Sequence, residues 1–154
     1  MPGEPDAADG LVIREARVED AEAVAVLCGE LGYPISAAHA AAHLHDPRGA
    51  ELLVAERDGS VVGWIELAVR RTVEFGDAAE IQAFVVTAAE RGRAVGSRLL
   101  AAAEAWARAR RLPRLRVRSN VVRERTHRFY LERGYVERKR QVVFDKMLGG
   151  ELLR

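Results

Sequence analysis

The clearest hydrophobic pattern of the chain lies near its middle. Residues 81–86 form a short, largely apolar run rich in β-branched side chains, which is typical of a buried strand. From residue 95 to 107 apolar side chains recur at intervals of three and four, which predicts a helix that buries one stripe. The hexad between them, Arg-Gly-Arg-Ala-Val-Gly at residues 91–96, holds small and basic residues. The pattern therefore predicts a strand, a tight turn and a long helix that begins inside the hexad.

Similar patterns predict the other elements. Before the hexad we expect a strand at 11–13, a helix at 20–31 that ends at Gly32, a second helix with Ser36 as N-cap, and a hairpin of strands 52–56 and 61–69 around Asp58-Gly59. Residues 70–77 are expected to form a loop or a frayed strand end that borders the substrate. After the hexad we expect a strand at 114–118, a helix at 123–133 and strands at 135–136 and 142–144. This order predicts an α+β (mixed α/β) fold and excludes a doubly wound one.

Length and composition indicate one domain. With 154 residues and 49% hydrophobic content, we expect a disordered tail at 1–10, a single domain at 11–148 and a C-terminal tail at 149–154. The single cysteine, Cys28, excludes an intrachain disulfide and fits a reducing compartment. No run reaches the roughly 20 apolar residues of a membrane span, and the acidic start is unlike a signal peptide. We expect a cytoplasmic protein with no membrane partner.

Charge is distributed unevenly along the chain. Residues 1–90 carry 6 Arg and 17 Asp or Glu, a net charge of −11, whereas residues 91–154 carry 18 Lys or Arg and 6 Asp or Glu, a net charge of +12. The basic half fits either nucleic acid or a phosphorylated cofactor, with the acidic half attracting a cationic substrate. The Arg-rich segment lacks interleaved aromatic side chains for stacking bases, so we expect no nucleic acid partner.

The hexad has the chemistry of an anion site. A helix N-terminus presents backbone N–H groups without intrahelical partners and about half a positive charge. Gly92, Ala94 and Gly96 would let a bulky polyanion approach these amides, and Arg91 and Arg93 add formal charge. The hexad is neither a Walker A loop nor a dinucleotide fingerprint. These residues favour a diphosphate ligand.

Two motifs resemble a known family. The hexad resembles the Gln/Arg-x-x-Gly-x-Gly/Ala signature of the GNAT superfamily of N-acetyltransferases, with Ala94 where the inner glycine is usual. Because alanine tolerates helical dihedrals well, we expect the helix to form readily there. The segment Phe129-Tyr130 to Gly134-Tyr135 resembles the Phe-Tyr-x-x-x-Gly-Phe/Tyr element of the same superfamily. Together with the order of elements, the resemblance covers residues 11–147.

The resemblance implies a fold and a cofactor. The expected fold is GNAT-like, with a mostly antiparallel sheet of six to seven strands, a splay between the fourth and fifth strands, and about four helices. The implied co-substrate is acetyl-CoA, whose pantetheine would lie in the splay, and no metal is expected. The residues expected to bind it are Phe84, Val85, Val86, Arg91, Gly92, Arg93, Ala94, Val95, Gly96, Ser97, Asn120, His127 and Tyr130.

The resemblance also implies a mechanism, direct acetyl transfer to a primary amine. Tyr130 matches the general acid that protonates the departing thiolate. A main-chain N–H of Val85 or Val86 would meet the thioester oxygen. Glu80 is the first candidate for the general base, and the reserves are Glu66 and Glu74.

Some alternatives stay open at the level of sequence. Glutamine at position 82 cannot serve as a base, so a non-catalytic acyl-CoA sensor of the same fold is the alternative function. The acidic first half favours a cationic acceptor, such as a polyamine, an aminoglycoside-like compound or a lysine side chain of a protein. The family allows a homodimer through the last strands. His39, His43 and His45 share one predicted helix but lack the further ligands of a metal site.

Overall fold

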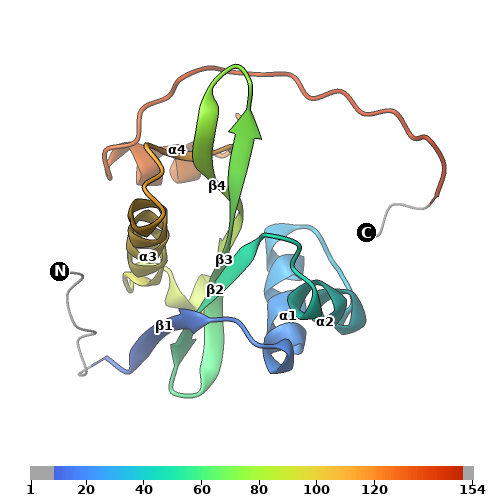
Figure 1. Cartoon of the computed structure of the whole chain (residues 1–154). Helices are drawn as coiled ribbons and strands as arrows, with labels where there is room; N and C mark the ends of the chain where they lie inside the picture. Colours follow the sequence, from blue (N-terminus) through green and yellow to red (C-terminus); the bar gives the residue numbers. More distant parts are fainter. Residues whose placement is uncertain (1–8, 151–154) are drawn as a thin grey trace. The chain divides into compact units, whose positions relative to one another are not determined.

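Alternating apolar segments in the first 117 residues form one sheet. The computed structural model describes residues 9–150, so most of the tail expected at 1–10, and residues 151–154, lie outside the described part. The strands are β1 (Leu11–Glu15), β2 (Glu51–Arg57), β3 (Ser60–Thr72), β4 (Gly76–Val86) and β5 (Leu115–Val117) (Figure 1). They lie in the order β1-β2-β3-β4-β5, antiparallel except for the parallel pair β4 and β5.

Helices cover both faces of this sheet. Helices α1 (Ala21–Leu31) and α2 (Ala37–His45) lie on one face, and α3 (Val95–Ala109) lies on the other (Figure 1). The predicted ends are confirmed: Gly32 takes a left-handed φ of 101°, and Ser36 Oγ accepts the His39 amide at 3.0 Å. Short 3-10 turns at Val18–Asp20 and Ala88–Glu90 precede α1 and α3.

The pleat divides the strand side chains between these two layers. Trp64 and Val85, which are cross-strand partners, are buried together with Val54 and the apolar stripe of α1. Since successive side chains alternate, Ile65 and Leu67 point to the α3 face, and both are fully buried. Even-numbered positions of β3 from Trp64 onward therefore share the face of α1 and α2.

The two hairpin turns give different results for the predictions. The turn at Asp58-Gly59 is confirmed, with φ values of 50° and 84°. Of the two alternatives for residues 70–77, the strand end is confirmed and the loop is wrong, because β3 and β4 continue to a short turn at 73–75. An Arg71–Asp77 ion pair of 3.5 Å and a 3.0 Å bond from the Phe75 amide to Thr72 Oγ1 hold this extension.

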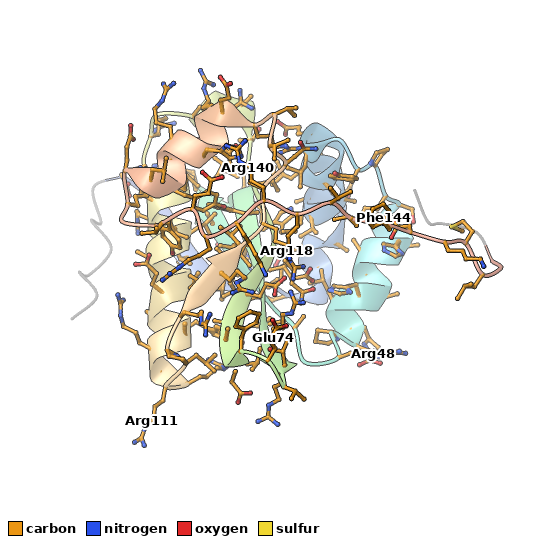
Figure 2. The ribbon with its side chains drawn as sticks, turned by 90° about the horizontal axis from the view of Figure 1, so that it is seen from above. Arg48, Glu74, Arg111, Arg118, Arg140 and Phe144 are labelled. Atoms are coloured by element: carbon orange, nitrogen blue, oxygen red, sulfur yellow. The ribbon has the colours of Figure 1, made fainter. Side chains whose placement is uncertain are left out.

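The sheet has five strands, so the prediction of six to seven strands is wrong. Residues from Arg118 form a second compact unit, which holds α4 (Glu124–Leu131) and is described by itself. The strands expected at 135–136 and 142–144 do not form. Val142, Val143 and Phe144, the last labelled in Figure 2, are 76%, 79% and 89% exposed. An apolar run becomes a strand only where a sheet edge pairs with its amides and carbonyls, and none does so here.

No helix within residues 9–150 has the length and apolar content needed to cross a bilayer.

Candidate active site

The hexad forms a turn at the N-terminus of α3. Gly92 and Ala94 both take positive φ, 80° and 64°, and α3 begins at Val95, inside the hexad as predicted. The Arg98 amide donates to the Ala94 carbonyl at 3.0 Å and closes the first helical turn. The amides of Val95 and Gly96 precede that bond, so they have no acceptor within the helix. The turn therefore presents the amide geometry that an anion requires.

Ala94 does not have the helical backbone dihedrals that were expected at its position. It lies outside the helix, in the left-handed region, where a Cβ atom approaches the following carbonyl oxygen. Its tolerance of helical dihedrals is therefore irrelevant, because glycine is the residue that this conformation favours.

A buried carboxylate fixes the chain before the turn. Glu90 accepts a hydrogen bond from Arg57 Nε at 3.1 Å and one from Arg93 at 3.2 Å. Arg57 and Glu90 are each 7% exposed, whereas the Arg93 side chain is 55% exposed. Arg93 is thus anchored at the turn with its guanidinium at the surface, and the Arg91 side chain is exposed beside it.

Strand β4 continues past the end of β5. Their pairing covers only Ala79 to Ile81 of β4, so the rest of β4 extends beyond β5 up to the hexad turn. The Thr87 amide donates to Val62 of β3 at 2.9 Å, and alternate pairs of an antiparallel ladder exchange such bonds. The register therefore directs the amides of Phe84 and Val86 away from β3 and that of Val85 toward it.

The candidate bases differ in their surroundings. Glu80 accepts from Arg70 at 3.3 Å, and its side chain is 13% exposed. Glu66 is hydrogen-bonded to His43 of α2. Because Ala68 pairs with Glu80, both carboxylates lie on the sheet face of α1 and α2. Glu74 lies in the exposed turn between β3 and β4, where Figure 2 labels it.

A cleft of about 560 Å³ opens beside Glu66. The sequence did not predict this cleft. Glu51 accepts from Trp106 and, at 3.1 Å, from Arg110, which also stacks 4.2 Å over the Trp106 ring. The lining residues come from segments far apart in the sequence, so no local pattern reveals the cleft. They include Glu15, His43, Leu44, Pro47, Glu51, Glu66, Val69, Trp106 and Arg110. Among residues 9–150, no three His, Cys, Asp or Glu side chains are grouped to hold a metal ion.

The remaining predicted residues lie in the second unit. His127 Nε2 contacts the Asn120 carbonyl at 2.9 Å, and Asn120 Oδ1 accepts the Val122 amide. Tyr130 is the buried residue of α4 and packs edge-on against Phe129 and Tyr135, with ring centres 5.4 and 5.5 Å away. Burial raises the pKa of Tyr130 to about 12, so its hydroxyl keeps its proton at neutral pH.

A helix N-terminus suited to an anion follows directly on a strand that extends beyond its neighbour, and this arrangement suits a transferase whose donor combines phosphates with an extended chain. Residues 15–135 match the model of the Acetyltransferase (GNAT) family. The chain is also 37% identical over 129 residues to the aminoalkylphosphonate N-acetyltransferase of Salmonella typhimurium LT2, covering 80% of this chain and 83% of that protein. The chain therefore belongs to the GNAT acetyltransferase family, and it is an N-acetyltransferase.

Solved structures support the fold. The ribosomal-protein-alanine N-acetyltransferase of Brucella melitensis biovar Abortus 2308 superposes with a TM-score of 0.75 at 22% identity, covering 89% of this chain and 99% of that one. The aminoglycoside N-acetyltransferase AAC(6')-Iy, in complex with a CoA-containing bisubstrate analogue, gives 0.76 at 19% identity and covers 89% and 98%. At such identities the likeness confirms the GNAT fold and says nothing about the acceptor.

Proposed function

We propose that this chain transfers the acetyl group of acetyl-CoA directly to the primary amine of a small acceptor. The observation that carries the proposal is the continuity of the edge of β4 beyond Ile81 with the turn that starts α3. The pyrophosphate would bind the amides of Val95, Gly96 and Ser97 and the exposed Arg91 and Arg93, with Gly92 and Ala94 beneath it. Pantetheine would lie along β4 as an added strand.

The register of β3 and β4 supports a choice of main-chain groups for the thioester. The amide of Val85 is directed toward β3, so Phe84 and Val86 supply the outward-facing groups of this edge. Of the two, Phe84 is closer to the end of β5. Its N–H would stabilise the negative charge that develops on the thioester oxygen as the amine attacks.

Proton transfers complete the reaction. The acceptor ammonium loses a proton to Glu80, directly or through water, since only the neutral amine has the lone pair that attacks. The amine nitrogen then forms the amide bond as the carbon–sulfur bond breaks. Tyr130, protonated because its pKa is about 12, gives its proton to the coenzyme A thiolate. Asn120 and His127, which contact each other at the start of α4, are proposed to border the cofactor.

The name of the Salmonella relative supports one class of acceptor. That protein acts, by its name, on aminoalkylphosphonates, which combine a primary amine with an anionic group. A small amine of this kind is the proposed acceptor, in place of a polyamine. A cytoplasmic location is part of the proposal and fits the single free cysteine, Cys28.

Thermal unfolding with acetyl-CoA, followed by a thiol-release assay on a panel of amines, tests the proposal. Acetyl-CoA should raise the melting temperature of the wild type, because a ligand that binds only the folded state stabilises it. Gly96→Leu should abolish this rise by blocking access to the helix N-terminus. Gly29→Leu is the matched control, since a Cβ there meets nothing within 4 Å. Stabilisation by acetyl-CoA without thiol release for any amine would support the sensor instead, and no stabilisation at all would refute both.

A further inference from the structure

Three guanidinium groups gather on one face of the sheet, next to the candidate base. Arg70 of β3 shares this face with Ala68, and Glu80 is the cross-strand partner of Ala68. On β5, Arg116 is the partner of Glu80. Arg114 lies two residues earlier and therefore points to the same side. The face thus presents Arg70, Arg114 and Arg116 around Glu80, while Glu66, on the same face, is bonded to His43.

Only one of these guanidiniums is neutralised within the described part of the chain. Arg70 forms an ion pair with Glu80 at 3.3 Å. Neither Arg114 nor Arg116 has a carboxylate partner among residues 9–150. Like charges on neighbouring positions of one sheet face destabilise it unless an anion lies between them. This face therefore has an excess positive charge with no internal partner.

An aromatic ring holds the two unpaired guanidiniums together. The guanidinium carbons of Arg114 and Arg116 lie 5.9 and 5.6 Å from the centre of the Phe75 ring. Arg114 also donates to the Phe75 carbonyl at 3.2 Å. Both side chains are thus oriented toward the same region at the end of the hairpin of β3 and β4.

The register places the two arginines next to the candidate base. Arg116 lies one residue, about 3.3 Å along the strand, before Val117, where the pairing of β5 with β4 ends. Glu80 lies directly opposite Arg116 on β4. The anionic end of an acceptor at the arginines would therefore place its amine near Glu80 and the open edge of β4.

We propose that Arg114 and Arg116 bind the tetrahedral oxyanion of the acceptor, a phosphonate or phosphate. The two arginines would thereby select amines that carry such a group over amines that lack one. The inference rests on the proposed function and adds its specificity. Guanidinium groups recognise such oxyanions through charge-assisted, often bidentate hydrogen bonds. Ala68 and Ala78, both small, leave room between the arginines above the sheet.

Paired acceptors test this assignment. The measurement is kcat/KM for aminoethylphosphonate and for ethanolamine, whose hydroxyl replaces the phosphonate. Arg116→Gln should lower the value for aminoethylphosphonate about 10- to 100-fold, the effect of losing one hydrogen bond between charged groups, and change that for ethanolamine less than about threefold. Arg114→Gln should act in the same direction, and Arg116→Lys should restore part of the loss.

Arg71→Gln is the matched control. Arg71 precedes Thr72 on the same strand as Arg70, faces the opposite side of the sheet and is 81% exposed, so its loss removes the same charge without touching the face. Equal losses for both acceptors, or equal losses in Arg71→Gln and Arg116→Gln, would overturn the assignment while leaving the acetyltransferase reaction intact.

Binding provides the second measurement. If the wild type turns over no amine, aminoethylphosphonate is titrated calorimetrically into the protein that has been saturated with coenzyme A. This titration shows whether Arg116 binds the phosphonate. Binding that is lost in Arg116→Gln and kept in Arg71→Gln supports the assignment even though the proposed reaction fails. Absent binding, or binding unaffected by Arg116→Gln, overturns it.

Discussion

Replacing Ala94 with glycine should stabilise the protein, against the usual effect of such a change. A left-handed conformation costs a residue with a Cβ atom about 1–2 kcal/mol, and Ala94 has φ 64° and ψ 10°. Glycine avoids this cost but adds about 0.4–1 kcal/mol of unfolded-state entropy. The difference predicts a free energy of unfolding higher by about 0.5–1 kcal/mol. For a domain of this size the melting temperature should rise by about 2–3 °C.

Urea and thermal unfolding measure this difference, and Ala101→Gly is the control. Ala101 is an exposed residue inside α3, where the same substitution should lower the free energy of unfolding by about 1 kcal/mol. The two variants should therefore shift stability in opposite directions. Removing the methyl group should also tighten acetyl-CoA binding, since the phosphates can approach the turn more closely. Destabilisation of Ala94→Gly by as much as Ala101→Gly would refute the assignment of strain to this position.

Three further variants address the reaction and the turn. Tyr130→Phe should lower kcat about 10²–10⁴-fold with unchanged acetyl-CoA affinity, whereas an unchanged kcat would leave Tyr130 a packing residue. Because its folded pKa of about 12 lies above the usual value near 10, wild-type stability should fall between pH 10 and 12 more than that of Tyr130→Phe, as measured by urea unfolding. Glu80→Gln should lose activity near neutral pH and regain it at alkaline pH, where the amine is already neutral, and superimposed pH profiles would transfer the role to Glu66. Glu90→Gln should cost roughly 2 kcal/mol of unfolding free energy because the buried Arg57 loses its carboxylate partner at 3.1 Å and keeps only Asp9 among the described residues, whereas Arg93→Gln, at a half-exposed site, should cost less than about 1.

The elements near the hexad were predictable because their signals are local. The apolar run at residues 81–86 and the stripe starting at Val95 each lie within one element, and the structure forms β4 and α3 there. Gly32 and Ser36 likewise terminate and start helices through contacts with residues close in sequence. Such features depend on backbone dihedrals and nearby hydrogen bonds, which a short stretch of sequence specifies.

Features that depend on distant residues were not predictable. The apolar residues at 142–144 resemble a strand, but pattern alone does not supply a sheet edge to pair with them. Residues 70–77 are polar enough for a loop, yet Arg70 and Thr72 pair with Ala78 and Gly76 and so continue the hairpin. The bond between His43 and Glu66 joins residues 23 positions apart on different elements. The spacing of Glu80 relative to the hexad did identify a carboxylate near the open edge of β4, because strand and hexad are continuous in the chain.

The acidic and basic halves of the sequence are not separate charged surfaces in the folded chain. Part of the negative charge of the acidic first half is neutralised internally, since several of its carboxylates pair with arginines of that same half. Asp20 and Glu56 both accept from Arg14, and Glu80 accepts from Arg70. Arg116, from the basic half, lies across from Glu80 on the neighbouring strand. Charges of both signs therefore lie beside the open edge of β4. A site with this polarity suits an acceptor that carries an ammonium at one end and an anion at the other. It suits a polyamine less well, because the positive charges of a polyamine would lie near Arg114 and Arg116.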